Sequence, residues 1–340
     1  TGEFGLIAPE ALDLQSILDV YYIAPIDATL NYETYDVIDS VDGYGFDLAL
    51  AQQKLDEADY GATIEIPFTV ISPEVTTESL KAAFYKDVLA TYTAKYDSDE
   101  NRDTNLHLAC KAINGVVLFP GEAFSYNEAL GERTEARGYK PGPSFSGGKT
   151  VDTIGGGICQ VSSALYYCAM KADMGIGQRT NHGYAVSYVP LGMDAAVSWD
   201  TLDFTFVNTS NYPIRIEASS DKGNVTVSIV GTDDKDYYIE MLYEVLSTET
   251  YETVYKSYPS DNPEGYTSGM YLMEPHTGYS IQTYRCKYDK ATNNLISQVV
   301  EAASYYAKSD AVICIIEDEA TEPTQGIGNG NVTEADGALH

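Results

Sequence analysis

The amino-acid sequence predicts a multidomain α+β protein with an all-β C-terminal module. Three observations support this prediction. The 340 residues exceed what one ordinary domain needs, so two or three domains are expected. Up to about residue 232, runs with helical apolar spacing alternate with strand-like runs. After that point the helical patterns stop, and the runs that follow are strand-like and rich in tyrosine, of which the chain has 29.

Residues 1–75 are predicted to form a small α+β domain. Apolar residues at helical spacing predict a helix over 12–22, and Asp47 is the expected N-cap of a second helix. Alternation predicts a strand or hairpin over 28–41 and a strand over 62–70.

Residues 76–103 are predicted to be a helical connector. Thr76 or Thr77 can cap a helix-like segment that runs to Tyr96 and has its apolar face between Leu80 and Leu89. The central domain, 104–232, follows and begins with a helix over 104–115.

The rest of the central domain is predicted to contain a helix from Cys159 and several strands. The expected strands are 184–189, 195–199, 203–208 and a closing hairpin of 214–218 with 224–231. A β-rich module is expected over 233–318, in which 279–288 and 311–316 look like paired strands. The tail, 319–340, is acidic and glycine-rich and is expected to be disordered.

The formal net charge of −31 restricts the partners of the protein. It opposes binding to nucleic-acid phosphates and to anionic lipid surfaces, although solubility alone also accounts for it. No apolar run reaches the ~18 residues of a membrane span. Because the chain begins Thr-Gly-Glu without methionine, we expect that a secretory signal or anchor was removed, and membrane attachment only through such an anchor.

The five cysteines leave two interpretations open. Cys110 with Cys168 and Cys286 with Cys314 can be paired as disulfides, which leaves Cys159 as a free thiol. Alternatively, all five are reduced and pack as small apolar side chains.

Residues 147–182 carry the strongest chemical signal. A glycine triplet precedes Cys159, and a cysteine at a helix start is favoured as the thiolate by the helix dipole. Free backbone N–H groups beside the glycines can form an oxyanion hole. His182 is the expected base and Asp194 the carboxylate that orients it, with Asp203 as the competing carboxylate. The alternative is structural: a tight loop, a packed cysteine and a hydrogen-bonded turn histidine.

Further polar residues are candidates for substrate binding, although each is also explained as a cap, a turn or a surface residue. An arginine of this group can bind a peptide carboxylate bidentately. The candidates are Glu122, Ser125, Asn127, Arg133, Gly156, Gly157, Gln160 and Arg179. No cofactor is expected, and no metal either, because one cysteine and one histidine without metal-ligand spacing make a weak zinc pattern.

Several motifs in order resemble the VanW family, named for an accessory protein of vancomycin-resistance clusters. They include NLHLACKAINGVVLFPGEAFSYN (105–127), GERTEARGY (131–139), GGGICQVSSALYYC (155–168), YVPLGMDAAV (188–197) and DFTFVN (203–208). The chain departs from the family pattern at Cys110 and Cys168, where a small apolar residue is expected, and at residues 181–183.

The resemblance extends to the flanks by pattern and position. Residues 1–75 resemble a peptidoglycan-binding domain, and 236–318 resemble a small extracellular β module. The order of cysteine, histidine and aspartate resembles papain-like and transglutaminase-like enzymes. Together these resemblances imply a Gram-positive-type exported protein that is extracellular or associated with the cell wall.

Two functions therefore remain open. The first is a non-enzymatic protein that binds peptidoglycan or its peptide stems, or assists envelope assembly. The second is a cysteine-dependent acyltransferase or hydrolase that acts on peptidoglycan peptides through Cys159, His182 and Asp194.

Overall fold

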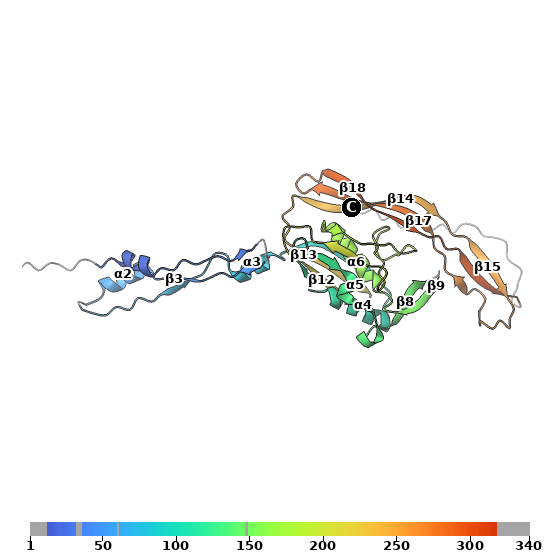
Figure 1. The fold of residues 1–340 in the computed structure, drawn as a ribbon, viewed down its shortest axis with the longest axis horizontal. Helices are drawn as coiled ribbons and strands as arrows, with labels where there is room; N and C mark the ends of the chain where they lie inside the picture. The colour runs from blue at the N-terminus through green and yellow to red at the C-terminus, as the bar shows by residue number, and fades with distance from the viewer. Residues whose placement is uncertain (1–11, 32–35, 60, 147–148, 318–340) are drawn as a thin grey trace, which may run out of the picture.

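The protein has three parts arranged along its length (Figure 1). A computed structural model describes residues 12–31, 36–59, 61–146 and 149–317. A slender N-terminal part leads into a central body of helices on a sheet, and long C-terminal strands lie against that body. The mixed α+β class predicted from the sequence is confirmed.

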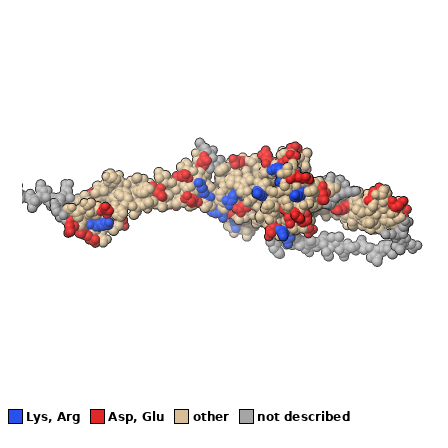
Figure 2. Space-filling model, turned by 90° about the horizontal axis from the view of Figure 1, so that it is seen from below, with Lys and Arg blue, Asp and Glu red and all other residues tan. Residues whose placement is uncertain are grey.

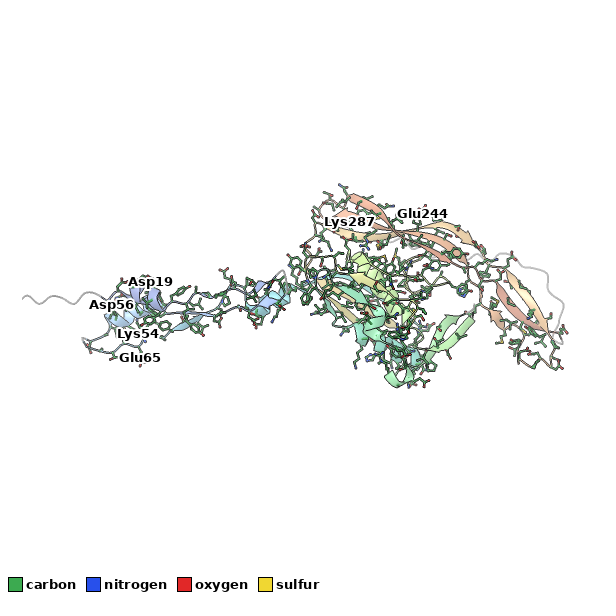
Figure 3. The ribbon with its side chains drawn as sticks, viewed as in Figure 1. Asp19, Lys54, Asp56, Glu65, Glu244 and Lys287 are labelled. Carbon is green, nitrogen blue, oxygen red and sulfur yellow. The ribbon has the colours of Figure 1, made fainter. Side chains whose placement is uncertain are left out.

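The N-terminal part has a small core formed by Leu14, Phe46 and Ala51. Its elements are α1 (Leu14–Tyr21), β1 (Thr29–Leu30), β2 (Val37–Ile38), β3 (Gly43–Gly45), α2 (Leu48–Asp56), β4 (Thr69–Ile71) and α3 (Thr77–Ala83). Asp47 caps α2 as predicted, accepting two backbone N–H groups. The Lys54 ammonium donates to the carbonyl oxygen of Glu65 and ties α2 to the returning chain (Figure 3).

The predicted helical connector over 76–103 is wrong in its second half. Helix α3 ends at Ala83, and β5 (Asp87–Lys95) follows. Strand β5 pairs antiparallel with β13 (Asn224–Gly231) along its length and belongs to the central sheet. Pairing with a distant strand outweighed the local helical pattern, as often happens with short apolar runs.

The central sheet has the strand order β5-β13-β12-β6 and is buried on one face. Strand β12 (Ile214–Asp221) and β13 form the predicted hairpin, and β6 (Val117–Leu118) completes the sheet. Helices α4 (Glu100–Ile113) and α6 (Cys159–Lys171) pack on the buried face. That face consists of alternate residues of the hairpin, Ile214, Ile216, Val225, Val227 and Ile229.

Helix α6 is buried on several sides, which explains why it is mostly apolar or small. Beside the central sheet it contacts β14 (Tyr237–Glu249), whose Ile239 and Met241 join the same core. Strand β14 pairs with β17 (Gly278–Asp289), which pairs with β18 (Leu295–Tyr306). The helix thus lies between the central sheet and the C-terminal sheet (Figure 1).

The C-terminal region is β-rich, as predicted, but its pairing differs from the prediction. A second sheet has the order β15-β19-β16, with β15 (Thr253–Tyr258), β16 (Tyr271–Met273) and β19 (Ala311–Ile316). The predicted pairing of 279–288 with 311–316 is wrong, because β17 pairs with β14 and β18, whereas β19 pairs with β15 and β16. The predicted tail, 319–340, lies outside the described residues.

The remaining elements surround the N-terminal end of α6. They are β7 (Ala123–Ser125), α5 (Tyr126–Leu130), a 3-10 turn (Glu135–Arg137), β8 (Pro141–Ser146), β9 (Lys149–Ile154), β10 (Gly175–Ile176) and β11 (Thr205–Val207). The strands predicted over 184–189 and 195–199 are wrong, because residues 177–204 form a long loop between β10 and β11. Side-chain hydrogen bonds shape this loop, and such contacts leave no alternation in a sequence.

The predicted disulfides are wrong. All five cysteines are free thiols. The Cys168 thiol lies in the core and donates to the carbonyl of Val227. Cys286 and Cys314 belong to different sheets, on β17 and β19. Four of the five therefore act as buried small side chains, and only Cys159 is half-buried.

On the face seen in Figure 2, acidic side chains lie in several separate groups rather than in one patch. Of the helices in the described ranges, none combines the length and the apolar character needed to span a membrane.

Candidate active site

Cys159 is the first residue of α6, as the sequence predicted. The glycine triplet before it lets the backbone pass closer to β8 than residues with a Cβ would allow. Gly155 and Gly157 have φ angles of +80° and +101°, in the region that favours glycine. A Cβ on Gly156 would overlap the carbonyl oxygen of Gly142, which lies on β8.

A buried asparagine on α4 holds this glycine loop in place. The Asn105 amide donates to the carbonyls of Lys140 and Gly156, at 2.9 and 3.0 Å, and its oxygen accepts the Lys140 N–H. One side chain thus fixes both β8 and the residues that precede Cys159. The first asparagine of NLHLACKAING, Asn105, therefore positions the glycine loop.

The serines of CQVSS attach the start of α6 to the long loop. The Ser162 hydroxyl donates to the carbonyl of Ala195 at 2.7 Å, and the Ser163 hydroxyl accepts the Ala195 N–H at 3.0 Å. Beside them, the Cys159 Sγ lies 3.5 Å from both the N and the O of Val197. These contacts bring residues 194–197 beside the thiol.

His182 and Asp194 meet on this loop. Nδ1 of His182 lies 2.6 Å from Oδ2 of Asp194, and the His182 backbone N–H donates to the same oxygen at 2.7 Å. A carboxylate only accepts hydrogen bonds, so Nδ1 carries a proton and Nε2 is left for the thiol. Asp203, the competing carboxylate, instead accepts from Ser125 and the backbone of Asn127.

The electrostatics favour a thiolate–imidazolium pair. Burial acts to raise the pKa of Cys159, but the hydrogen bond and charge of His182 outweigh it and lower that pKa below its usual value. Burial acts to lower the pKa of His182, but its hydrogen bonds to Asp194 and Cys159 raise it to about 9. Both shifts favour the ionised forms, a thiolate on Cys159 and an imidazolium on His182.

The Asp194 carboxylate is fully buried and receives four donors. Oδ2 accepts two from His182, and Oδ1 accepts the Tyr306 hydroxyl at 2.5 Å and Arg179 Nη2 at 3.1 Å. Burial acts to raise the pKa of Asp194, but these hydrogen bonds and the His182 charge lower it. The carboxylate therefore stays charged and has a fixed orientation.

Two backbone N–H groups at the start of α6 are candidates for the predicted oxyanion hole. Among the described residues, no group accepts from the backbone N–H of Gly157 or Cys159. Both belong to the N-terminal end of α6, where the helix dipole also favours negative charge.

Most of the other predicted binding residues have internal partners. Gln160 is buried between Arg102 and the Lys95 carbonyl, so its amide is not directed at the thiol. Arg179 serves Asp194 and the Gly192 carbonyl, and its side chain is only 6% exposed. Ser125 caps α5, and Glu122 accepts the Phe119 N–H in a turn.

Among the predicted binding residues, Arg133 is the one whose charge acts on the thiol of Cys159. Its guanidinium donates to Asn127 and Gly131 and lies over the ring of the single tryptophan, Trp199, at 5.8 Å. Burial has the largest effect on the pKa of Cys159 and raises it, and His182 has the next largest and lowers it. The positive charge of Arg133 also lowers this pKa. Trp199 itself is 38% exposed.

Sequence reasoning missed two tyrosines of the site. The Tyr188 hydroxyl lies 3.4 Å from Nε2 of His182, and Tyr306 reaches Asp194 from β18. Tyr188 stands in YVPLGMD, six residues after His182, so its position in the motif was a usable signal. Tyr306 had no signal, because it lies 112 residues from its partner.

His182 and Asp194 both lie in the loop between β10 and β11. The papain-like or transglutaminase-like topology stays a prediction. In the described part of the chain, no three His, Cys, Asp or Glu side chains group as metal ligands.

Comparison with known proteins decides the family. A family model for VanW like protein matches residues 101–230. The chain is 37% identical over 216 residues to the uncharacterized protein YoaR of Bacillus subtilis strain 168, covering 62% of this chain and 71% of YoaR. The chain belongs to the VanW-like family. Cys159, His182 and Asp194 all lie within the matched VanW-like region.

A second relative agrees with this assignment. The chain is 29% identical over 151 residues to the vancomycin B-type resistance protein VanW of Enterococcus faecalis, covering 43% of this chain and 54% of that protein. The predicted resemblance to the VanW family is thus confirmed, while the peptidoglycan-binding domain over 1–75 stays a prediction.

Two solved structures with partial similarity are G5 domains. The IgA1 protease G5 domain aligns at 13% identity over 24% of this chain and 94% of that structure, with a TM-score of 0.16. The G5 domain of HP0197 aligns at 11% identity over 23% of this chain and 92% of that structure, with a TM-score of 0.13. These scores are too low to establish a shared fold.

Proposed function

We propose that this VanW-like protein is a cysteine-dependent enzyme that transfers or hydrolyses an acyl group. The observation that carries the proposal is the 2.6 Å contact between His182 and Asp194 beside Cys159, whose thiol pKa is lowered by the hydrogen bond and charge of His182. A packing cysteine does not need this environment. Cys168, on the same helix, has its pKa raised by burial alone.

The proposed reaction has two steps. The Cys159 thiolate attacks a substrate carbonyl, and the oxyanion is stabilised by the N–H groups of Gly157 and Cys159. His182 then gives its proton to the leaving group, and an acyl-enzyme thioester remains. In the second step neutral His182 takes a proton from water or an acceptor amine, which attacks the thioester and releases Cys159.

We propose peptides of the cell wall as the substrate class, and the outside of the cell as the location. Membership of the VanW-like family supports this context, since one relative is named for vancomycin resistance. Arg133 and the exposed Trp199 ring beside the thiol suit a peptide that carries a carboxylate.

Alkylation of Cys159 as a function of pH tests the activated thiol. We expect iodoacetamide to modify Cys159 at pH 6 faster than it modifies an unperturbed thiol such as glutathione. His182→Gln is expected to move the profile to that of an ordinary thiol. The matched control is His107→Gln, because His107 is exposed on α4, and this variant is expected to react like the wild type.

Mass spectrometry of the Cys159 peptide measures the alkylation and distinguishes modification of Cys159 from modification of the four buried thiols. Incubation with wall peptides then shows whether an acyl adduct forms on the same residue. The proposal is overturned if the wild-type Cys159 reacts no faster than glutathione at pH 6 and His182→Gln leaves the rate unchanged.

A second candidate function is the non-enzymatic peptidoglycan-binding role, favoured by one observation. The N-terminal part exposes several aromatic rings on its small surface, namely Tyr21, Tyr22, Tyr44 and Phe68. Exposed apolar patches of this kind often mark binding sites. If this role is right, Phe68→Ala reduces cosedimentation with insoluble peptidoglycan and Cys159→Ala does not; equal binding of Phe68→Ala and wild type contradicts it.

A further inference from the structure

The end of strand β18 contacts the catalytic loop directly. Tyr306 is 1% exposed, and its hydroxyl donates to Oδ1 of Asp194 at 2.5 Å. The same hydroxyl accepts the backbone N–H of Gly192 at 2.9 Å. One side chain of the C-terminal sheet therefore binds both the triad carboxylate and the backbone two residues before it.

The neighbours of Tyr306 hold the other segment of the loop. The Asn181 amide donates to the Tyr305 carbonyl at 2.7 Å, and the Ala307 N–H donates to the Gly183 carbonyl at 2.8 Å. These two bonds flank His182 on both sides. Residues 305–307 thus fix the position of the histidine as well as that of the carboxylate.

Ser304 completes the contact through an arginine. Nη1 of Arg179 donates to the Ser304 hydroxyl at 2.8 Å, while Nη2 binds Asp194. The carboxylate oxygen Oδ1 is therefore occupied by Tyr306 and Arg179. Only Oδ2 is left for His182, and that oxygen accepts both His182 donors.

Strand β17 adds a steric constraint. A Cβ on Gly192 would lie 2.6 Å from a methyl group of Thr283 and 2.9 Å from one of Ile281. The loop therefore reaches the C-terminal sheet at a position that only glycine fills. Gly192 also has a φ of +80°, which a residue with a Cβ rarely adopts.

We propose that the C-terminal sheet is part of the catalytic unit, with Tyr306 as the positioning residue of Asp194. This inference rests on the proposed function of Cys159. It goes beyond the family match, which ends at residue 230, whereas Tyr306 lies in β18 (Leu295–Tyr306). Tyr306 acts through Asp194 and His182 and does not itself contact the reacting atoms.

The physical argument concerns rotation of the carboxylate. Without the Tyr306 hydroxyl, Oδ1 accepts only from Arg179. The carboxylate can then rotate, so that Oδ1 no longer faces only Arg179 and Oδ2 no longer faces only His182. The imidazolium is then held less firmly beside the thiol, and the thiolate loses stabilisation. A hydrogen bond to an ionised group is worth roughly one pKa unit or more.

The test compares Tyr306→Phe with Tyr305→Phe in the full chain. Each variant removes one hydroxyl from adjacent residues of β18, but the Tyr305 side chain is 58% exposed and its carbonyl, which holds Asn181, is retained. The readout is the pH profile of Cys159 alkylation by iodoacetamide, followed by mass spectrometry. Circular dichroism establishes that both variants are folded.

We expect the acid limb of the Tyr306→Phe profile to move upward by roughly one pH unit, with about a tenfold slower reaction below the limb. Tyr305→Phe should match the wild type. Ser304→Ala, which removes the Arg179 partner, should shift the limb in the same direction by less. This last variant also reports on the contact if Tyr306→Phe does not fold.

The outcomes separate this inference from the proposed function. If wild-type Cys159 is activated but Tyr306→Phe and Ser304→Ala both match Tyr305→Phe, the positioning role is overturned and the proposed enzyme stands. If wild-type Cys159 reacts as an ordinary thiol, the proposed function fails, and this inference fails with it.

Discussion

Replacement of Asp194 by asparagine is the sharpest test of how the site is built. The substitution keeps the size of the side chain but removes its charge. It also places an NH2 group where the carboxylate accepted hydrogen bonds, since the four groups bonded to its oxygens, from three residues, all donate. Arg179, with a side chain only 6% exposed, then loses its buried counterion.

The expected cost follows from that burial. Removing one partner of a buried ion pair costs about 3–5 kcal/mol in the free energy of unfolding, because the other charge is left uncompensated. For a domain of this size such a loss lowers the unfolding temperature by roughly 10 °C. In addition, His182 loses the group that raises its pKa, so alkylation of Cys159 at pH 6 should fall to that of an ordinary thiol.

Urea unfolding followed by the fluorescence of Trp199 measures this loss. Trp199 is the only tryptophan of the chain and lies on the loop between β10 and β11, so its signal reports on the central domain. The control is Asp200→Asn in the same loop. Asp200 is exposed with a φ of +61°, a conformation that asparagine tolerates well. A loss of less than ~1 kcal/mol for Asp194→Asn, equal to that of the control, would refute the buried ion pair as described.

Two further results are expected. Gly156→Ala should abolish rapid alkylation of Cys159, because its Cβ would overlap the Gly142 carbonyl, whereas Gly183→Ala has open space and should react normally; equal rates would contradict the packing. Burial acts to raise the pKa of Asp173, but bonds from Tyr237 and Lys287 lower it. The Asp173 carboxylate therefore stabilises the folded state above its unfolded pKa of about 4, and this contribution is lost as the pH falls through its lower folded pKa. Thermal unfolding should show a deficit for Asp173→Asn at pH 6 that shrinks toward pH 3, and a constant deficit would contradict this.

The Asp173 cluster is the second attachment between the central domain and the C-terminal sheet. Arg285 Nη1 and Lys287 Nζ bind its two oxygens at 3.0 and 2.9 Å, and Arg285 also pairs with Glu301. Lys287 lies on β17, at the end of the sheet that covers α6 (Figure 3). Together with Tyr306, this cluster attaches the C-terminal sheet to the central domain at two places.

Local features of the chain were predictable where neighbouring residues determine them. Asp47 caps α2, Cys159 begins α6, and the turn before Asn224 closes the hairpin of β12 and β13, all as expected. Each depends on side chains within a few residues of the element. The segment 87–95 was not predictable in this way, because its pairing with β13 involves residues 129 to 144 positions away.

The sequence by itself indicated the family and the candidate residues Cys159, His182 and Asp194, because these lie in short ordered motifs, although it left Asp203 as a competing carboxylate. Only the tertiary structure decided which polar side chains serve the site. It assigned Arg179 to Asp194 and Asp203 to α5, and it brought Tyr306 from β18 to the triad carboxylate. The physical reason is that a buried charge needs partners from every element packed around it, and no local pattern records which distant strand supplies them.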